Sequence, residues 1–142
     1  MMQRSKNTGF TLIEVLVVLV ILGLLAGLVG PRLFGKVDAS KVKTAETQVR
    51  MLKTALQTFR LDVGRYPTTE EGLAVLEKRP EGEAIPTWAG PYLDEGLPAD
   101  PWGNPFQYRD EPADGQDFTL YSLGADGKAG GEGLDADLGY LP

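Results

Sequence analysis

The sequence predicts an α+β fold in which one long amino-terminal helix packs on a small carboxy-terminal antiparallel sheet. Two observations predict the helix: an almost wholly apolar run at residues 10–30, and a later stretch whose apolar residues recur every three or four positions. A third predicts the sheet, because two short segments near the carboxyl end alternate as strands do. We therefore divide the chain into a short amino-terminal segment at 1–9, an apolar helix at 10–33, an amphipathic helix at 34–63 and an α+β head at 64–142.

The apolar run is about 21 residues long, enough for a helix to span the roughly 30 Å hydrocarbon core of a bilayer. One interpretation is a cleaved secretory signal with residues 15–22 as its core; another is a signal anchor held by the basic Arg4 and Lys6. Neither explains Glu14, the one charged residue in the run. A lone acidic side chain at mid-membrane costs about 2.5 to 3.5 kcal/mol on insertion scales, so Glu14 is a candidate functional residue.

The sequence around this charge carries a specific motif: residues 6–14 read KNTGFTLIE. They resemble the leader and cleavage site of type IV pilins and type II secretion pseudopilins. The resemblance implies that a prepilin peptidase cuts between Gly9 and Phe10 and that residues 1–9 are removed as a leader. It also implies N-methylation of the new terminus on Phe10.

A cut before Phe10 would place a new α-amine about one helical turn from Glu14. The two charges would attract strongly in a low dielectric, which lowers the cost of burying the carboxylate. The amine and Glu14 of the same helix could form this contact. Our hypothesis is that Glu14 instead pairs with the Phe10 amine of a neighbouring copy. Because only one axial stagger satisfies both charges, the pair would set the register of a filament.

A break is expected at residues 27–31, which read GLVGP. Proline removes a backbone donor and clashes one turn back, and the glycines add local freedom. One interpretation is a tolerated kink in a membrane helix. The other, which draws on the resemblance, is a stretch that unwinds when subunits pack into a fibre.

The amphipathic helix beyond this break has apolar residues spaced alternately by three and four. They are Val42, Ala45, Val49, Leu52, Leu56, Phe59 and Val63. Gly64 is the expected stop. We expect this seam to cover the head's own sheet, while the apolar half of the helix does most of the bundling in a fibre.

The head contains several local signals. Thr68 and Glu71 form a capping-box pattern that predicts a helix start, and the Pro- and Gly-rich residues 80–101 predict a loop. Strands are predicted at 105–109 and 118–123, with a short third strand at 138–141. Residues 100–106 read DPWGNPF, a turn sequence expected to hold a buried Trp102.

Two motifs of the head extend the resemblance. Residues 100–106 and residues 121–128, which read YSLGADGK, are similar to markers of the major pseudopilins of type II secretion. The resemblance implies the type IV pilin-like fold with a calcium loop in the head. The chain has no Cys, whereas the usual major subunit of a type IV pilus closes its variable loop with a cysteine pair.

Residues 122–138 hold the candidate metal site. Their glycines let the backbone fold around an ion, and their carboxylates and carbonyls suit Ca²⁺; a solvated acidic loop is the alternative. The EF-hand spacing is absent, although residues 130–135 match the start of one Gly-Gly-x-Gly-x-Asp calcium repeat. The resemblance implies that the Leu123 carbonyl, Asp126 and Asp137 bind Ca²⁺. Asp135 and Glu132 are further candidates at positions where this chain departs from the family pattern.

Charge is distributed unevenly within the net charge of −6. Residues 32–63 carry seven basic and three acidic side chains, whereas residues 64–142 carry five basic and sixteen acidic ones. This asymmetry favours contacts between copies, and the acidic head would repel the phosphates of a nucleic acid. With no His, no Cys and no nucleophile–base pair, we expect the protein not to be an enzyme.

The resemblance implies a structural function. Copies of the chain would form a homo-oligomeric helical filament, the periplasmic pseudopilus of a type II secretion system, which drives export of folded proteins across the outer membrane. The implied partners are prepilin peptidase, minor pseudopilins and an inner-membrane assembly platform. Before assembly the subunit would be a single-pass inner-membrane protein with a periplasmic head. The alternatives are a type IV pilus subunit for adhesion, motility or DNA uptake, and a membrane-anchored calcium-binding module that never polymerises.

Overall fold

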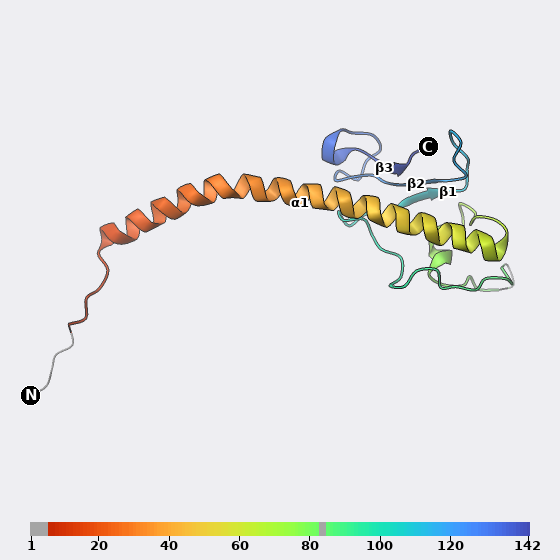
Figure 1. Cartoon of the computed structure of the whole chain (residues 1–142), viewed down its shortest axis with the longest axis horizontal. Helices are drawn as coiled ribbons and strands as arrows, with labels where there is room; N and C mark the ends of the chain where they lie inside the picture. Colours follow the sequence, from red (N-terminus) through yellow and green to blue (C-terminus); the bar gives the residue numbers. More distant parts are fainter. Residues whose placement is uncertain (1–5, 83–84) are drawn as a thin grey trace, which may run out of the picture. The chain divides into compact units, whose positions relative to one another are not determined.

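A computed structural model describes residues 6–82 and 85–142 of the chain, so Arg4 and the first half of the expected leader lie outside it. The elements follow one another as α1 (Leu12–Val63), the 3-10 helix η1 (Leu73–Leu76), β1 (Gln107–Arg109), β2 (Thr119–Ser122), the 3-10 helix η2 (Gly133–Asp135) and β3 (Leu138–Tyr140) (Figure 1). The chain forms two compact units that divide within α1, after Val37. The α+β class is therefore confirmed.

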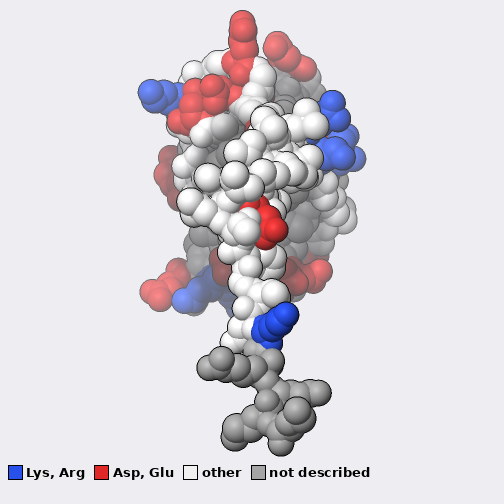
Figure 2. Space-filling view, turned by 90° about the vertical axis from the view of Figure 1, so that its left-hand side faces the viewer, with Lys and Arg blue, Asp and Glu red and all other residues white. Residues whose placement is uncertain are grey.

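The first unit contains the apolar stem, which we define as residues 12–37 of α1. Its large apolar side chains are 46 to 80% exposed. In Figure 2, which views the chain from the amino-terminal side, white groups fill the middle of the view and most charged groups lie around its rim. Helix α1 is not interrupted at residues 27–31 in the single chain, because Pro31 lies inside a continuous helix; this agrees with a proline tolerated within the helix, and unwinding of the stretch in a fibre stays a prediction. A proline deletes a single backbone donor, and the hydrogen-bonded turns on both sides are long enough to keep the helix intact.

The second unit begins with the amphipathic part of α1, and its seam packs as expected. Ala45, Val49, Leu52, Leu56 and Phe59 are all buried, with the outermost seam residues half-buried. Gly64 ends the helix as predicted, with φ at 86° and its N–H donating to the Arg60 carbonyl at 2.8 Å. Glycine adopts this left-handed conformation without the strain that a Cβ would bring.

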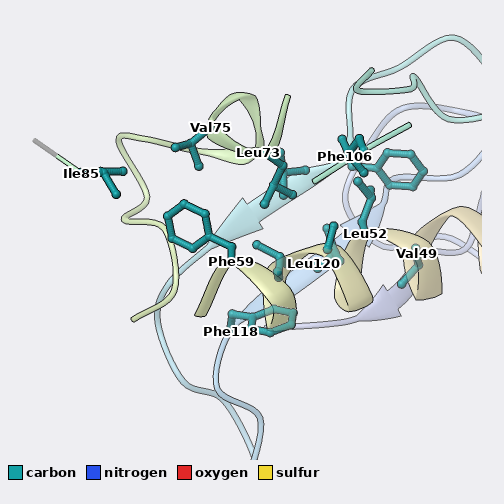
Figure 3. Packing of buried hydrophobic residues seen from close by; sticks show 13 residues of the cluster. Val49, Leu52, Phe59, Leu73, Val75, Ile85, Phe106, Phe118 and Leu120 are labelled. Atoms are coloured by element: carbon teal, nitrogen blue, oxygen red, sulfur yellow. The ribbon is translucent and has the colours of Figure 1, made fainter. Parts of the chain in front are cut away.

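The core of the head lies between α1, η1 and a three-stranded sheet (Figure 3). The sheet is antiparallel in the order β1-β2-β3, with Tyr108 opposite Leu120 and Leu120 opposite Tyr140. Leu120 on the central strand is fully buried and faces the core with Leu52, Phe59 and Phe118. All three predicted strands are confirmed, each one or more residues shorter than expected.

The capping box at Thr68 and Glu71 is also confirmed. The Glu71 N–H donates to Thr68 Oγ1 at 3.2 Å, and the Thr68 N–H donates to Glu71 Oε2 at 2.8 Å. The turn leads into η1, which is a 3-10 helix of four residues. Arg65 binds the same carboxylate at 2.8 Å and thereby fixes the chain where it leaves α1.

The prediction of a buried Trp102 is wrong, because its side chain is only half-buried. The buried residues of the 100–106 segment are Phe106, which joins the core, and Asp100, which is 4% exposed. The turn places the Asp100 carboxylate inward, where it accepts hydrogen bonds from backbone N–H groups, and leaves the Trp102 indole partly exposed.

Candidate functional site

The amino-terminal candidate site centres on the first turn of α1. The Thr11 N–H donates to Glu14 Oε2 at 3.2 Å, and the Glu14 N–H donates to Thr11 Oγ1 at 3.3 Å. This reciprocal pair is a capping box, so Glu14 satisfies a backbone donor that the helix leaves open. Thr11 was not among the residues expected to act here, although its spacing from Glu14 is the same as that of Thr68 from Glu71.

Apolar side chains surround this carboxylate. Phe10 is 89% exposed, and Leu12 and Ile13 are 80 and 72% exposed, so no part of the described chain covers the site. Among the described residues, α1 is the one helix long and apolar enough to cross a membrane by length and composition. A surface of this size and apolarity is typical of a segment that contacts lipid or another protein.

The second candidate site is the loop at residues 123–137, which joins β2 to β3. The Ala125 N–H donates to the Leu134 carbonyl at 2.9 Å, which brings the two arms of the loop together. Gly124 lies so close to the second arm that an added Cβ would come within 2.7 Å of the Ala136 carbonyl oxygen, and its φ is 73°. Only glycine fits at this crossing, so the Leu123 and Asp126 arm lies against the arm that carries Asp135 and Asp137.

The acidic side chains of this loop differ in the hydrogen bonds that they accept. Asp126 Oδ1 accepts from the Lys128 N–H at 3.0 Å, and Asp137 Oδ2 accepts from the Gly130 N–H at 3.0 Å. The other carboxylate oxygen of Asp137, Oδ1, is buried and has no hydrogen-bond partner within the described chain. Glu132 is exposed and its carboxylate forms none of the hydrogen bonds described here.

Residues 6–82 and 85–142 contain no group of three acidic, His or Cys side chains close enough together to hold a metal ion. A metal here would therefore depend largely on backbone carbonyls and water, both of which Ca²⁺ accepts. The unpartnered, buried Asp137 Oδ1 fits such a hard cation, since a buried carboxylate oxygen without a donor is costly. The five expected ligands remain predictions.

A buried polar cluster that sequence reasoning missed adjoins this loop. Asp100 Oδ1 accepts from the backbone N–H groups of Trp102 and Asn104 at 3.1 and 2.8 Å. Its Oδ2 accepts from Ser122 Oγ at 2.7 Å, and that hydroxyl oxygen accepts from the Gly124 N–H at 3.1 Å. Both motifs were noticed in the sequence, yet residues 22 positions apart give no local sign that their side chains meet.

Contacts that hold the fold together cause the shifted pKa values of Glu71 and Tyr108 in the head. The hydrogen bond from Arg65 lowers the pKa of Glu71, and burial raises the pKa of Tyr108, whose hydroxyl donates to the Pro67 carbonyl at 2.7 Å. Each group fixes the segment that follows α1. Neither contacts the loop at 123–137 by a described hydrogen bond.

Comparison with known proteins gives consistent matches over nearly the whole chain. The family described as "Type II secretion system (T2SS), protein G" matches residues 32–140, and the prokaryotic N-terminal methylation motif matches residues 4–30. The chain is 48% identical to the type II secretion system core protein G of Pseudomonas aeruginosa, with 97% of each chain covered. It is 44% identical to that of Vibrio cholerae, with 98% of this chain and 94% of the relative covered.

A solved structure supports the same grouping. The crystal structure of the major pseudopilin from the type 2 secretion system of enterohaemorrhagic Escherichia coli superposes with a TM-score of 0.59 at 33% identity. The match covers 76% of this chain and 92% of that one.

Proposed function

The chain belongs to the protein G family of type II secretion systems, and from this premise we propose that its copies polymerise into a pseudopilus that moves folded proteins across the outer membrane. It is a membrane-anchored structural subunit of the major pseudopilin type. The family is not known as an enzymatic one. The observation that carries the proposal is the pairing of a protein G head with an amino-terminal methylation motif in one chain.

The subunit is held in the inner membrane by the apolar stem, with the acidic head in the periplasm. A prepilin peptidase removes residues 1–9 and Phe10 becomes the N-methylated terminus. The position of the methylation motif over residues 4–30 supports this assignment, because it spans both the expected cut and the stem. The exposed apolar side chains of the stem then pack against those of neighbouring copies, with minor pseudopilins and an assembly platform as further partners.

Phe10 and Glu14 set the register of that packing. In the uncut chain the Glu14 carboxylate caps the Thr11 N–H, so it already faces the end of the helix where the new amine will arise. After the cut, the Phe10 amine of a neighbouring copy is the cation that this carboxylate accepts. A mutual pairing of this kind is satisfied at one stagger only.

Calcium stabilises the head through the loop at 123–137. The Leu123 carbonyl, Asp126 and Asp137 hold the ion, with Asp135 and Glu132 as further oxygen donors. Bound Ca²⁺ supplies positive charge that neutralises these oxygens and clamps the loop. The orphaned Asp137 Oδ1 supports this proposal, as does the closure of the two arms by the Ala125 N–H.

The experiment that tests the function is complementation. The major pseudopilin gene is deleted from a host that has a type II secretion system, and this chain is expressed in its place. Secretion of a folded reporter enzyme is then measured. Electron microscopy with an antibody against the head then checks for fibres in overexpressing cells, and mass spectrometry checks for a methylated terminus at Phe10. Restored secretion with labelled fibres supports the proposal, whereas a processed, membrane-bound chain that neither forms fibres nor restores secretion contradicts it.

A further inference from the structure

Asp100 is an unusual group in this head because a carboxylate that is 4% exposed lies without a cationic partner. Within the described residues the ion pairs are formed elsewhere, by Lys43, Arg60 and Arg65. Burying an ionised carboxylate is costly unless hydrogen bonds compensate for the lost water. Three donors do so here: two backbone N–H groups on Oδ1 and the Ser122 hydroxyl on Oδ2.

The two oxygens serve different purposes. The Oδ1 contacts to Trp102 and Asn104 close the turn at 100–104, as an aspartate at the start of a turn ordinarily does. The Oδ2 contact is not local, because it reaches Ser122 at the end of β2. Turn formation therefore explains the contacts of Oδ1 alone. The Oδ2 contact connects the turn to β2, the strand that leads into the loop at 123–137.

Ser122 passes this connection on to the loop. Its side chain is fully buried, its O–H donates to Asp100, and its oxygen accepts from the Gly124 N–H at 3.1 Å. Residue 123 lies between these two anchored positions, so the direction of its carbonyl is fixed from both sides. The same turn touches the loop again, since an added Cβ on Gly127 would lie 3.1 Å from Asn104 Nδ2.

We propose that Asp100 and Ser122 are positioning residues that hold the first arm of the loop in the geometry that binds calcium. The inference rests on the calcium site of the proposed function. The contacts at Gly124 and Gly127 fall at the residues directly after Leu123 and Asp126, the two ligands of that arm. Groups that orient metal ligands without touching the metal typically contribute about 10- to 100-fold to affinity.

The test compares two buried hydroxyls of the same strand. Ser122→Ala removes the bridging hydroxyl. Thr119→Val is the matched control, because Thr119 is 2% exposed on β2 and its Oγ1 has no hydrogen-bond partner in the described chain. Asp100→Asn keeps an acceptor for the turn and replaces the acceptor that faces Ser122 with a donor.

Calcium chloride is titrated calorimetrically into each full chain in detergent micelles after removal of bound metal, and melting is measured in excess chelator. We expect Ser122→Ala and Asp100→Asn to raise the Kd for calcium about 10-fold or more and Thr119→Val to change it by less than about 3-fold. We also expect the calcium-induced rise in melting temperature to shrink in the first two variants, which a loss of stability alone would not cause.

Two results overturn the inference in distinguishable ways. If the unaltered chain binds calcium and both variants bind it with an unchanged Kd, the positioning role is wrong and the calcium site stands. If the unaltered chain binds no calcium, the site and the positioning role fail together. Should Ser122→Ala not fold, amide exchange at Gly124 in the unaltered chain serves instead: bound calcium is expected to slow it, and unchanged exchange with calcium bound refutes the role.

Discussion

The charge of Glu14 can be separated from its capping role by two substitutions. Glu14→Gln keeps an oxygen that can accept from the Thr11 N–H, so the capping box at 3.2 and 3.3 Å is preserved while the charge is lost. Glu14→Leu removes both. If charge pairing with the Phe10 amine of a neighbour sets the register, both variants fail to assemble.

The expected magnitudes differ enough to be told apart. Loss of a cap costs about 1 kcal/mol, which is roughly a fivefold change in an equilibrium constant. Two unit charges about 4 Å apart interact by about 4 kcal/mol at an effective dielectric constant of about 20, which is roughly a thousandfold. Charge pairing therefore predicts that Glu14→Gln assembles nearly as poorly as Glu14→Leu, whereas a pure capping role predicts near-normal assembly of Glu14→Gln.

The assay counts antibody-labelled fibres released from overexpressing cells and measures membrane insertion by resistance to alkaline extraction. Insertion is expected to be retained or improved in both variants, because each removes a carboxylate that costs about 2.5 to 3.5 kcal/mol at mid-membrane. Thr11→Ala, which removes one hydrogen bond of the box and no charge, is the matched control and should still assemble. Normal fibres from Glu14→Gln would refute the pairing.

Three further predictions concern the head and the part of α1 that packs on it. Excess chelator should lower the melting temperature of the head, by the equivalent of about 2.7 kcal/mol relative to calcium at a hundred times the Kd for calcium; identical melting curves with and without chelator would contradict a calcium site. Leu56→Ala, at a fully buried position, should destabilise the full chain in detergent by about 2 to 5 kcal/mol in thermal denaturation followed by circular dichroism, whereas Leu61→Ala at an 84% exposed position should change little. The hydrogen bond from Arg65 lowers the pKa of Glu71 in the folded state. The ionised Glu71 side chain therefore stabilises the fold above its unfolded-state pKa, and this stabilisation is lost as pH falls through the folded-state pKa. Glu71→Gln should therefore flatten the acid side of a stability–pH profile, and an unchanged profile would show that this contact does not contribute.

Local patterns predicted the regular elements well. The seam from Val42 to Val63 determines which face of α1 is buried, because residues three and four apart lie on one face of a helix. Gly64 marks the end of α1 because only glycine adopts its positive φ without strain. The strands around Leu120 were visible in the alternation of residues, since successive side chains of a strand face opposite sides.

Contacts between distant residues were not predictable in this way. Nothing local indicates that Asp100 meets Ser122, and an indole next to a turn looks like a better core residue than a carboxylate. The expected break at Pro31 overstated a local rule, because a long helix tolerates the loss of one donor. The Thr11 capping box could have been found, since Thr11 and Glu14 have the required spacing within the apolar motif.

The exposure of the apolar stem has a consequence for how a subunit travels. Moving its row of half- to fully exposed apolar side chains into water would cost on the order of tens of kcal/mol, far more than a folded domain has to spare. A subunit that leaves the lipid must therefore be received at once by the stems already in place. On the proposed function, each stem would therefore pass directly from lipid into contact with neighbouring stems, and a free subunit in water would be strongly disfavoured.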